Sequence, residues 1–126
     1  MGTTERFGAV EQRDLPGKAA RRIGQSQALF REVNERISEI ARDFGHADGL
    51  SILCECATTG CHERIELTHS EYEHLRRMPT RFAVRRGHDI PAAERIVQEN
   101  ERFVTVEKFG ESGVAVITLD PRRQRT

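Results

Sequence analysis

Cys54-Glu55-Cys56-Ala57-Thr58-Thr59-Gly60-Cys61 is the stretch that decides the fold of this chain, because it holds all three cysteines of the sequence. Cysteines this close together indicate a metal site or, as an alternative, a redox site. On an extended strand Cys54 and Cys56 would lie about 6.6 Å apart, whereas two thiolates on one tetrahedral zinc lie about 3.8 Å apart. The chain must therefore bend between or just after these residues, and Gly60 permits a tight return before Cys61.

His88 is the residue that we predict as the fourth ligand. It follows Gly87 in a predicted loop, where backbone freedom suits ligand placement. The neighbouring Arg85-Arg86 could offset the negative charge of three thiolates on Zn²⁺. His62, which is adjacent to Cys61, is the alternative fourth ligand. The other histidines are expected at the surface or at a helix end: His46, His69 and His74.

Three interpretations of the cysteine cluster are open. Structural zinc in a Cys3His site fits the ligand types and a reducing cytoplasm, where clustered cysteines more often bind metals than form disulfides. An iron–sulfur cluster could use the same ligands. The third interpretation is a redox pair such as Cys56 and Cys61, or reduced thiols without a metal. We predict zinc, bound by Cys54, Cys56, Cys61 and His88.

The composition indicates one small domain. The chain has 126 residues, and its 20 basic and 20 acidic residues give zero net charge, which argues against strong non-specific binding to nucleic acid. Only 37% of the residues are hydrophobic and none is Trp, so the core must be small, and a small core gains from a bound metal. The sequence shows no secretory signal and no membrane-spanning stretch, so a cytoplasmic location is expected.

An amphipathic helix is predicted from Ser26, as its N-cap, to Gly45, as its end. Its apolar residues recur at steps of three or four positions: Leu29, Val33, Ile37, Ile40 and Phe44. We expect this stripe to pack on the protein's own sheet, and a partner-binding face is the alternative. Residues 1–25 are polar and are interrupted by Gly and Pro, which predicts a flexible leader.

After this helix, short strands and short helices are expected. Strand patterns at 50–54 and 64–67 predict a hairpin whose loop holds the cysteines. Thr68 and Glu71 have the spacing of a capping box for a helix that ends near Arg77. Strands are also predicted at 82–85, 103–108 and 114–119, the last two as a hairpin, and a short helix is predicted at 90–97.

The predicted fold class is therefore α+β. A single small domain at 26–120 is expected to contain an N-terminal amphipathic helix, a metal-holding β-hairpin, two further short helices and a small antiparallel sheet. Residues 121–126 are expected to be a basic, frayed tail.

The sequence contains no phosphate-binding loop, no nucleophile elbow and no H-E-x-x-H motif, so no catalytic residues are predicted. The acidic residues near the cysteines are expected to face solvent: Glu55, Glu63 and Glu66. The segment Arg76–Arg86, which includes Phe82, could contact nucleic acid or another acidic partner. Zero net charge favours a solvated surface instead.

Five motifs resemble those of short, uncharacterised, mostly actinobacterial proteins. They are the helix Ala28–Ile37, the C-E-C-x4-C segment Cys54–Cys61, the I-x-L-T-x-x-E-Y segment Ile65–Tyr72, the P-x-x-F at Pro79–Phe82 that leads to Gly87-His88, and the strand Val104–Lys108. Arg86 stands where that group often has Pro. The resemblance implies a bacterial, cytosolic metal-binding protein and adds no reaction.

Taken together, these features predict a small non-enzymatic zinc-binding protein that acts as a regulatory or adaptor module. One alternative is a redox or metal-sensing protein with an iron–sulfur cluster or reactive thiols. The other is a nucleic-acid-associated module that uses Arg76–Arg86. A protein partner of unknown identity is left open, and no membrane contact is expected.

Overall fold

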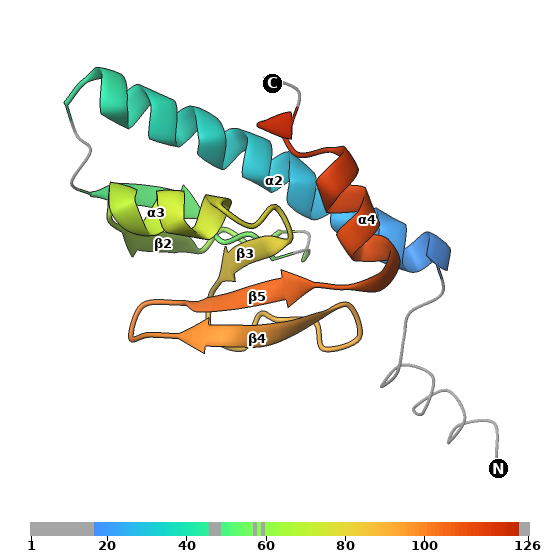
Figure 1. The fold of residues 1–126 in the computed structure, drawn as a ribbon. Coiled ribbons are helices and arrows are strands. Elements are labelled where there is room, and N and C mark those ends of the chain that lie inside the picture. Colours follow the sequence, from blue (N-terminus) through green and yellow to red (C-terminus); the bar gives the residue numbers. More distant parts are fainter. Residues whose placement is uncertain (1–16, 46–48, 57, 59, 124–126) are drawn as a thin grey trace, which may run out of the picture.

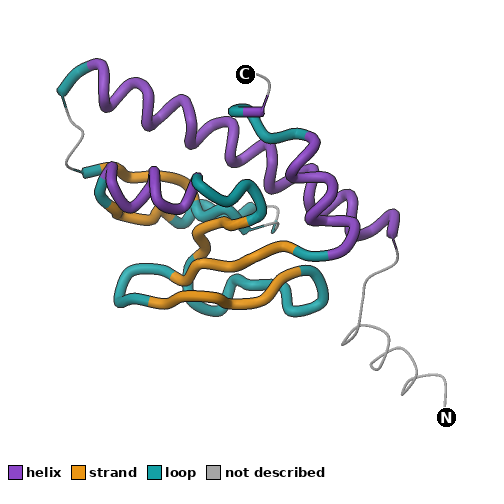
Figure 2. Tube along the Cα trace, viewed as in Figure 1, coloured by secondary structure: helices purple, strands orange, loops and turns teal. Residues whose placement is uncertain are grey.

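The computed structural model describes residues 17–45, 49–56, 58 and 60–123. They form an α+β fold, as predicted, in which the long helix α2 lies across two small antiparallel sheets (Figure 1, Figure 2). In chain order the elements are α2 (Gly17–Asp43), β1 (Leu50–Leu53), β2 (Arg64–Leu67), α3 (His69–Arg76), β3 (Arg81–Val84), β4 (Glu94–Glu99), β5 (Val104–Lys108) and α4 (Gly110–Thr118). None of the helices in this part of the chain is long and apolar enough to cross a membrane.

The first sheet is the predicted hairpin of β1 and β2. Leu50 pairs with Leu67 and Ile52 pairs with Ile65, and all four side chains are buried. Because alternate residues of a strand share one face, these apolar residues line the core together. The prediction is confirmed, and β1 ends at Leu53.

Helix α3 begins at the predicted capping box. The hydroxyl of Thr68 accepts a hydrogen bond from the backbone N–H of Glu71 (3.0 Å), and the carboxylate of Glu71 accepts one from the N–H of Thr68 (2.8 Å). These bonds satisfy two donors that a helix start otherwise leaves unpaired. Tyr72 and Leu75 face the core, as predicted.

The second sheet has the order β3-β5-β4, with β5 in its centre. Strands β3 and β5 are confirmed, but the short helix predicted at 90–97 is wrong, because residues Glu94–Glu99 form β4. One helical turn does form, where the N–H of Glu94 binds the carbonyl of Ile90 at 3.0 Å. From Glu94 onwards the chain pairs with the second edge of β5. A sheet edge offers a row of backbone partners, whereas an isolated helix this short is marginal.

The strand predicted at 114–119 is also wrong, since most of these residues belong to α4. Strand β5 already has a neighbour on each side, so it has no edge left for a returning hairpin strand. The chain turns away at Gly110, whose φ is 62°. Helix α4 then packs on α2 and buries Ala115 and Val116.

Helix α2 begins at Gly17 and not at Ser26, so residues 17–25 are helical rather than a flexible leader. Residues 1–16 lie outside the described part of the chain. The end of the helix agrees with the prediction: the N–H of Gly45 binds the carbonyl of Arg42 at 3.2 Å. The φ of Gly45 is 77°, the left-handed conformation that is common directly after a helix.

The orientation of α2 is the reverse of the prediction. In the expected apolar stripe only Ile37 packs partly on the core, while Leu29, Val33, Ile40 and Phe44 expose 60%, 42%, 50% and 71% of their surface. The buried face is small and polar: Ala20, Gly24, Gln27, Ala28, Arg31, Asn34, Glu35 and Ser38. Polar side chains lie inside because they find hydrogen-bond partners there, which offsets the cost of removing them from water.

Glu35 connects α2 with α3 and with the end of the chain. Its carboxylate accepts hydrogen bonds from Tyr72 Oη (2.6 Å), Arg76 Nε (2.9 Å) and Arg122 Nε (2.8 Å). Arg122 also binds Glu73 at 2.7 Å. The predicted frayed tail is therefore wrong at Arg122, and residues 124–126 lie outside the described part of the chain.

Gly24 allows α4 to approach α2 closely, which predicts the effect of Gly24→Ala. A Cβ atom at this position would lie 2.8 Å from the carbonyl oxygen of Ser112 and 2.9 Å from the Cβ of Ala115. Because the first is a backbone atom, α4 would have to shift. We expect the free energy of unfolding, measured by urea denaturation, to fall by about 1–3 kcal/mol. This loss should exceed the helix-propensity gain of about 1 kcal/mol.

Gly17→Ala is the matched control for this experiment. It lies in the same helix, and its new Cβ atom would meet side-chain atoms no closer than 3.6 Å. Its stability should equal or slightly exceed that of the wild type. A Gly24→Ala protein as stable as this control would contradict the close packing of α2 and α4.

The network around Glu35 predicts how stability depends on pH. Burial alone would raise the pKa of Glu35, but hydrogen bonds from Arg122 and Tyr72 and the charge of Arg76 lower it from 4.5 to about 2. Since the pKa is lower in the folded state, the carboxylate stabilises the fold above pH 4.5, and this contribution is lost as the pH falls towards 2. Glu35→Gln should therefore flatten the pH dependence of the free energy of unfolding in this window.

Urea denaturation at several pH values measures that dependence. Glu32→Gln, a substitution at an exposed position of the same helix, should keep the slope of the wild type. A Glu35→Gln protein with the wild-type slope would show that Glu35 titrates normally in the folded state.

Candidate metal centre

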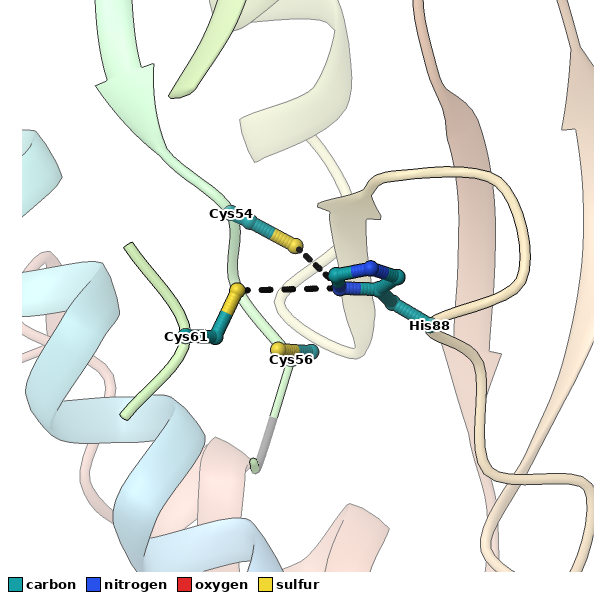
Figure 3. Close-up of side chains that lie close together, drawn as sticks. All are labelled: Cys54, Cys56, Cys61 and His88. Carbon is teal, nitrogen blue, oxygen red and sulfur yellow. Dashed lines mark hydrogen bonds between the residues drawn. The ribbon is translucent and has the colours of Figure 1, made fainter. Parts of the chain in front are cut away.

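Cys54, Cys56, Cys61 and His88 lie together, and each offers one ligand atom within 4.8 Å of the others. The Nδ1 atom of His88 is 3.6 Å from the sulfur of Cys54 and 3.6 Å from that of Cys61 (Figure 3). All three cysteines are free. The structure thus brings together the four residues predicted from the sequence. His62 is exposed and does not belong to this group.

The cysteine segment follows directly from the end of β1. The N–H of Cys54 binds the carbonyl of Glu63 at 2.9 Å and so extends the hairpin by one bond. Beyond it, Thr58 and Cys61 are joined by a backbone hydrogen bond of 3.2 Å, and Gly60 between them has a φ of 88°. This turn brings Cys61 back towards the sulfur atoms of Cys54 and Cys56. It is the bend that the spacing of the cysteines predicted.

His88 comes from the connection between β3 and β4. Its N–H binds the carbonyl of Arg85 at 2.9 Å, and Gly87 inside this turn has a φ of 88°. Glycine is needed here because a positive φ is strained for residues with a Cβ atom. The same turn directs the N–H of Arg85 at the sulfur of Cys54, 3.2 Å away. One turn therefore supplies a ligand and a hydrogen bond to another ligand.

The distances from His88 to Cys54 and Cys61 fit a single tetrahedral ion. With Zn–S near 2.3 Å and Zn–N near 2.0 Å, the sulfur and nitrogen ligands of one zinc lie about 3.5 Å apart. The two measured sulfur–nitrogen distances are both 3.6 Å. Thiolate and imidazole donors suit zinc and also iron. This group could hold a metal ion, and its ligand types leave the choice of metal open.

Burial affects the protonation of the sulfur ligands. It raises the pKa of the Cys54 thiol to about 12, although the N–H of Arg85 acts in the opposite direction. Burial also raises the pKa of Cys61. At neutral pH these groups would therefore carry protons in the absence of a cation, and metal binding would release them.

The two neighbouring arginines, which are predicted to offset the charge of the site, extend into solvent. Both are exposed and each has a carboxylate partner: Arg85 lies 3.8 Å from Glu63 and Arg86 lies 2.5 Å from Glu99. Their charges are thus shared with carboxylates and screened by solvent. The direct contact with the site comes from the backbone of Arg85 instead.

Glu55, which lies between Cys54 and Cys56, is buried, although the sequence predicted it at the surface. Glu63 and Glu66 are exposed as predicted, but Glu55 is 0% exposed. Its carboxylate accepts hydrogen bonds from Arg31 Nε (2.8 Å) and Nη2 (2.9 Å), Asn34 Nδ2 (3.0 Å) and the N–H of Ala83 (3.0 Å). Four donors satisfy this buried anion.

The backbone of Glu55 joins the two sheets to α2. Its N–H binds the carbonyl of Ala83 at 2.9 Å, and its carbonyl accepts a hydrogen bond from Gln27 at 2.9 Å. Arg31 also stacks on the ring of Phe82, 3.9 Å from its centroid. A signal for this arrangement exists in the sequence, because the polar residues of α2 recur with helical spacing just as the apolar ones do.

The segment Arg76–Arg86 does not form a continuous basic surface. Arg76 is buried and pairs with Glu35 and Asp120. Arg81 binds Glu107 at 2.9 Å. Phe82 is only 1% exposed, so it cannot stack on a nucleic-acid base.

The remaining histidines lie away from the four-residue group. His69 contacts Ser38 at 3.5 Å and Glu73 at 3.9 Å, and His74 is exposed on α3. His46 lies outside the described residues.

No protein-family model, curated protein or solved structure matches the chain. The geometry of the four-residue group therefore carries the functional argument.

The surroundings of Glu55 predict the effect of Glu55→Gln. The substitution leaves the buried charge of Arg31 without its counter-charge, which typically costs about 3–5 kcal/mol. We expect urea denaturation to show a loss of this size in the free energy of unfolding. Glu63→Gln, in the same loop but exposed, is the control and should change stability by less than about 0.5 kcal/mol. Equal effects of the two substitutions would contradict the role of Glu55.

Proposed function

We propose that this protein is a small non-enzymatic zinc-binding protein that acts as a regulatory or adaptor module. Zinc is bound by Cys54, Cys56, Cys61 and His88 and has a structural role. The observation that carries this proposal is the convergence of four ligand atoms within 4.8 Å. Structural zinc sites have four protein ligands, whereas catalytic zinc sites have three and keep one position open for water or substrate.

The origin of the ligands supports a structural role. The cysteines follow β1, and His88 comes from the connection between β3 and β4, so one ion would join the two sheets. In a domain with a small apolar core, such a link adds binding free energy to folding free energy. A cytoplasmic location, where the cysteines stay reduced, is part of the proposal. So is membership of the actinobacterial group whose motifs the sequence resembles.

An iron–sulfur or redox-sensing protein is the second candidate, because its ligands are the same. Two observations favour the first. The nitrogen of His88 lies equally far from two sulfurs, as expected around one ion, whereas a two-iron cluster distributes its ligands over two metals. Redox-sensing cysteines are solvent-accessible, but Cys54 and Cys56 are 3% and 0% exposed, and only Cys61 is half-buried.

Elemental analysis of the purified protein tests the proposal. We expect one zinc per chain, a colourless solution and a lower melting temperature after chelation. His88→Ala should lose most of the zinc, because the fourth protein ligand is then missing and only the three thiolates remain. His62→Ala is the control and should keep the zinc, because His62 is exposed and outside the group.

Iron in the elemental analysis, together with visible absorbance, would show that the site holds an iron–sulfur cluster and not zinc. Full zinc content in His88→Ala would overturn the choice of the fourth ligand. A protein that takes up no metal and has the same melting temperature with and without zinc would overturn the proposal as a whole.

A further inference from the structure

A cavity of about 380 Å³ lies between α3, the start of β3 and the hairpin of β4 and β5. Its volume falls within the range of small-molecule sites, which is about 300–1,000 Å³. The four residues of the candidate metal centre do not line it. A ligand of this cavity would therefore give the protein a second binding site, beyond the proposed function.

Thr105, on the central strand β5, places a buried hydroxyl at the cavity. Because neighbouring residues of a strand face opposite sides, Thr105 points to the cavity while Val104 and Val106 point to the core. Thr105 is only 7% exposed, and its hydroxyl is hydrogen-bonded to none of the described residues. A buried hydroxyl without a partner costs free energy. A polar group that enters the cavity can supply that partner.

Two arginines of the lining have unused N–H donors. Arg77, directly after α3, is exposed and forms no ion pair or side-chain hydrogen bond within the described part of the chain. Arg81 binds Glu107 through Nε at 2.9 Å, but its two Nη atoms bind none of the described side chains. His74 is the third basic residue of the lining. Guanidinium groups with free donors bind carboxylates through paired hydrogen bonds.

The two carboxylates that line the cavity are already paired with arginines outside it. Glu71 binds Arg102 at 2.7 Å and 2.9 Å, and Glu99 lies 2.5 Å from Arg86. Neither Arg102 nor Arg86 belongs to the lining. Since these negative charges are offset from outside, Arg77 keeps a positive charge without a counter-charge, and the cavity favours an anion.

We propose that this cavity binds a small organic carboxylate with a short apolar body, of the size of an aromatic acid. Arg77 and the Nη atoms of Arg81 bind the carboxylate, and the hydroxyl of Thr105 donates to one of its oxygens. The apolar residues of the lining, Leu75 and Phe103, contact the body of the ligand. A carboxylate fits better than a phosphate, because its single charge matches one unpaired arginine, whereas a phosphate carries nearly two charges at neutral pH.

The turn between β4 and β5, which borders the cavity, is fixed by its own hydrogen bonds. The Oδ1 atom of Asn100 accepts bonds from the N–H groups of Arg102 (2.8 Å) and Phe103 (2.9 Å). The N–H of Asn100 also binds the carbonyl of Phe103 at 3.0 Å. This side of the cavity is therefore formed before a ligand enters, as is usual for small-molecule sites.

An NMR titration of the full-length, zinc-loaded protein with benzoate tests the inference. We expect saturable shifts that are largest at the amides of residues 70–77 and 98–105. Benzamide has the same ring without the charge and should bind about tenfold more weakly. Acetate has the charge without the ring and should also bind about tenfold more weakly.

Substitutions identify the contacts. Arg77→Gln should raise the dissociation constant for benzoate about tenfold. Thr105→Val, which removes only the hydroxyl from a side chain of the same shape, should raise it about fivefold. Arg22→Gln is the matched control: Arg22 is exposed on α2 and, like Arg77, has no partner among the described residues. It should bind benzoate as the wild type does.

A titration without saturable shifts, or with shifts only elsewhere in the molecule, would overturn the site. Equal affinities for benzoate and benzamide would contradict the selection of an anion, and equal affinities for benzoate and acetate would contradict the apolar contact. Phosphate that binds more tightly than benzoate would refute the carboxylate. Wild-type affinity in both Arg77→Gln and Thr105→Val would refute the assigned contacts. Zinc content, measured on the same samples, tests the proposed function separately.

Discussion

The ion pair between Arg31 and Glu55 is the interaction on which the rest of this structure depends. Both side chains are buried, and Arg31 Nε lies 2.8 Å from Glu55 Oε2. A charge left alone in the interior destabilises a protein by about 3–5 kcal/mol, so α2 must lie where Arg31 reaches Glu55. Asn34 and the backbone of Ala83 complete the partners of the carboxylate. One buried group thus positions α2, β3 and the cysteine segment relative to one another.

The candidate metal centre lies on the other side of the segment that contains Glu55. Because successive side chains of an extended chain alternate, Cys54 and Cys56 face His88 while Glu55 faces α2. The polar interior and the ligand group are therefore coupled through three consecutive residues. Any change that moves Glu55 away from Arg31 also moves two sulfur atoms, and a bound ion would in turn hold Glu55 in place.

Buried pairs of opposite charge explain why the apolar side chains of α2 are exposed. Besides Arg31 and Glu55, the buried pair of Lys108 and Glu94 lies 2.6 Å apart, and Gln27 of α2 also donates to Glu94. Once its polar residues are engaged in this way, α2 cannot also turn Leu29 and Val33 inwards, since they lie on its opposite side. The apolar side chains on that opposite side therefore stay exposed.

Short-range rules determined what the sequence by itself could predict. The capping box of Thr68 and Glu71, the alternation in β1, β2 and β5, and the ligand chemistry of the three cysteines depend on neighbouring residues or on donor type, and His88 followed from its glycine and its loop. Tertiary structure decided the rest. Which face of α2 is buried depends on Glu55, because a polar stripe and an apolar stripe have the same period. Whether residues 94–99 and 114–118 form a strand or a helix depends on which edges of β5 are free, a property of the assembled sheet that no local pattern contains.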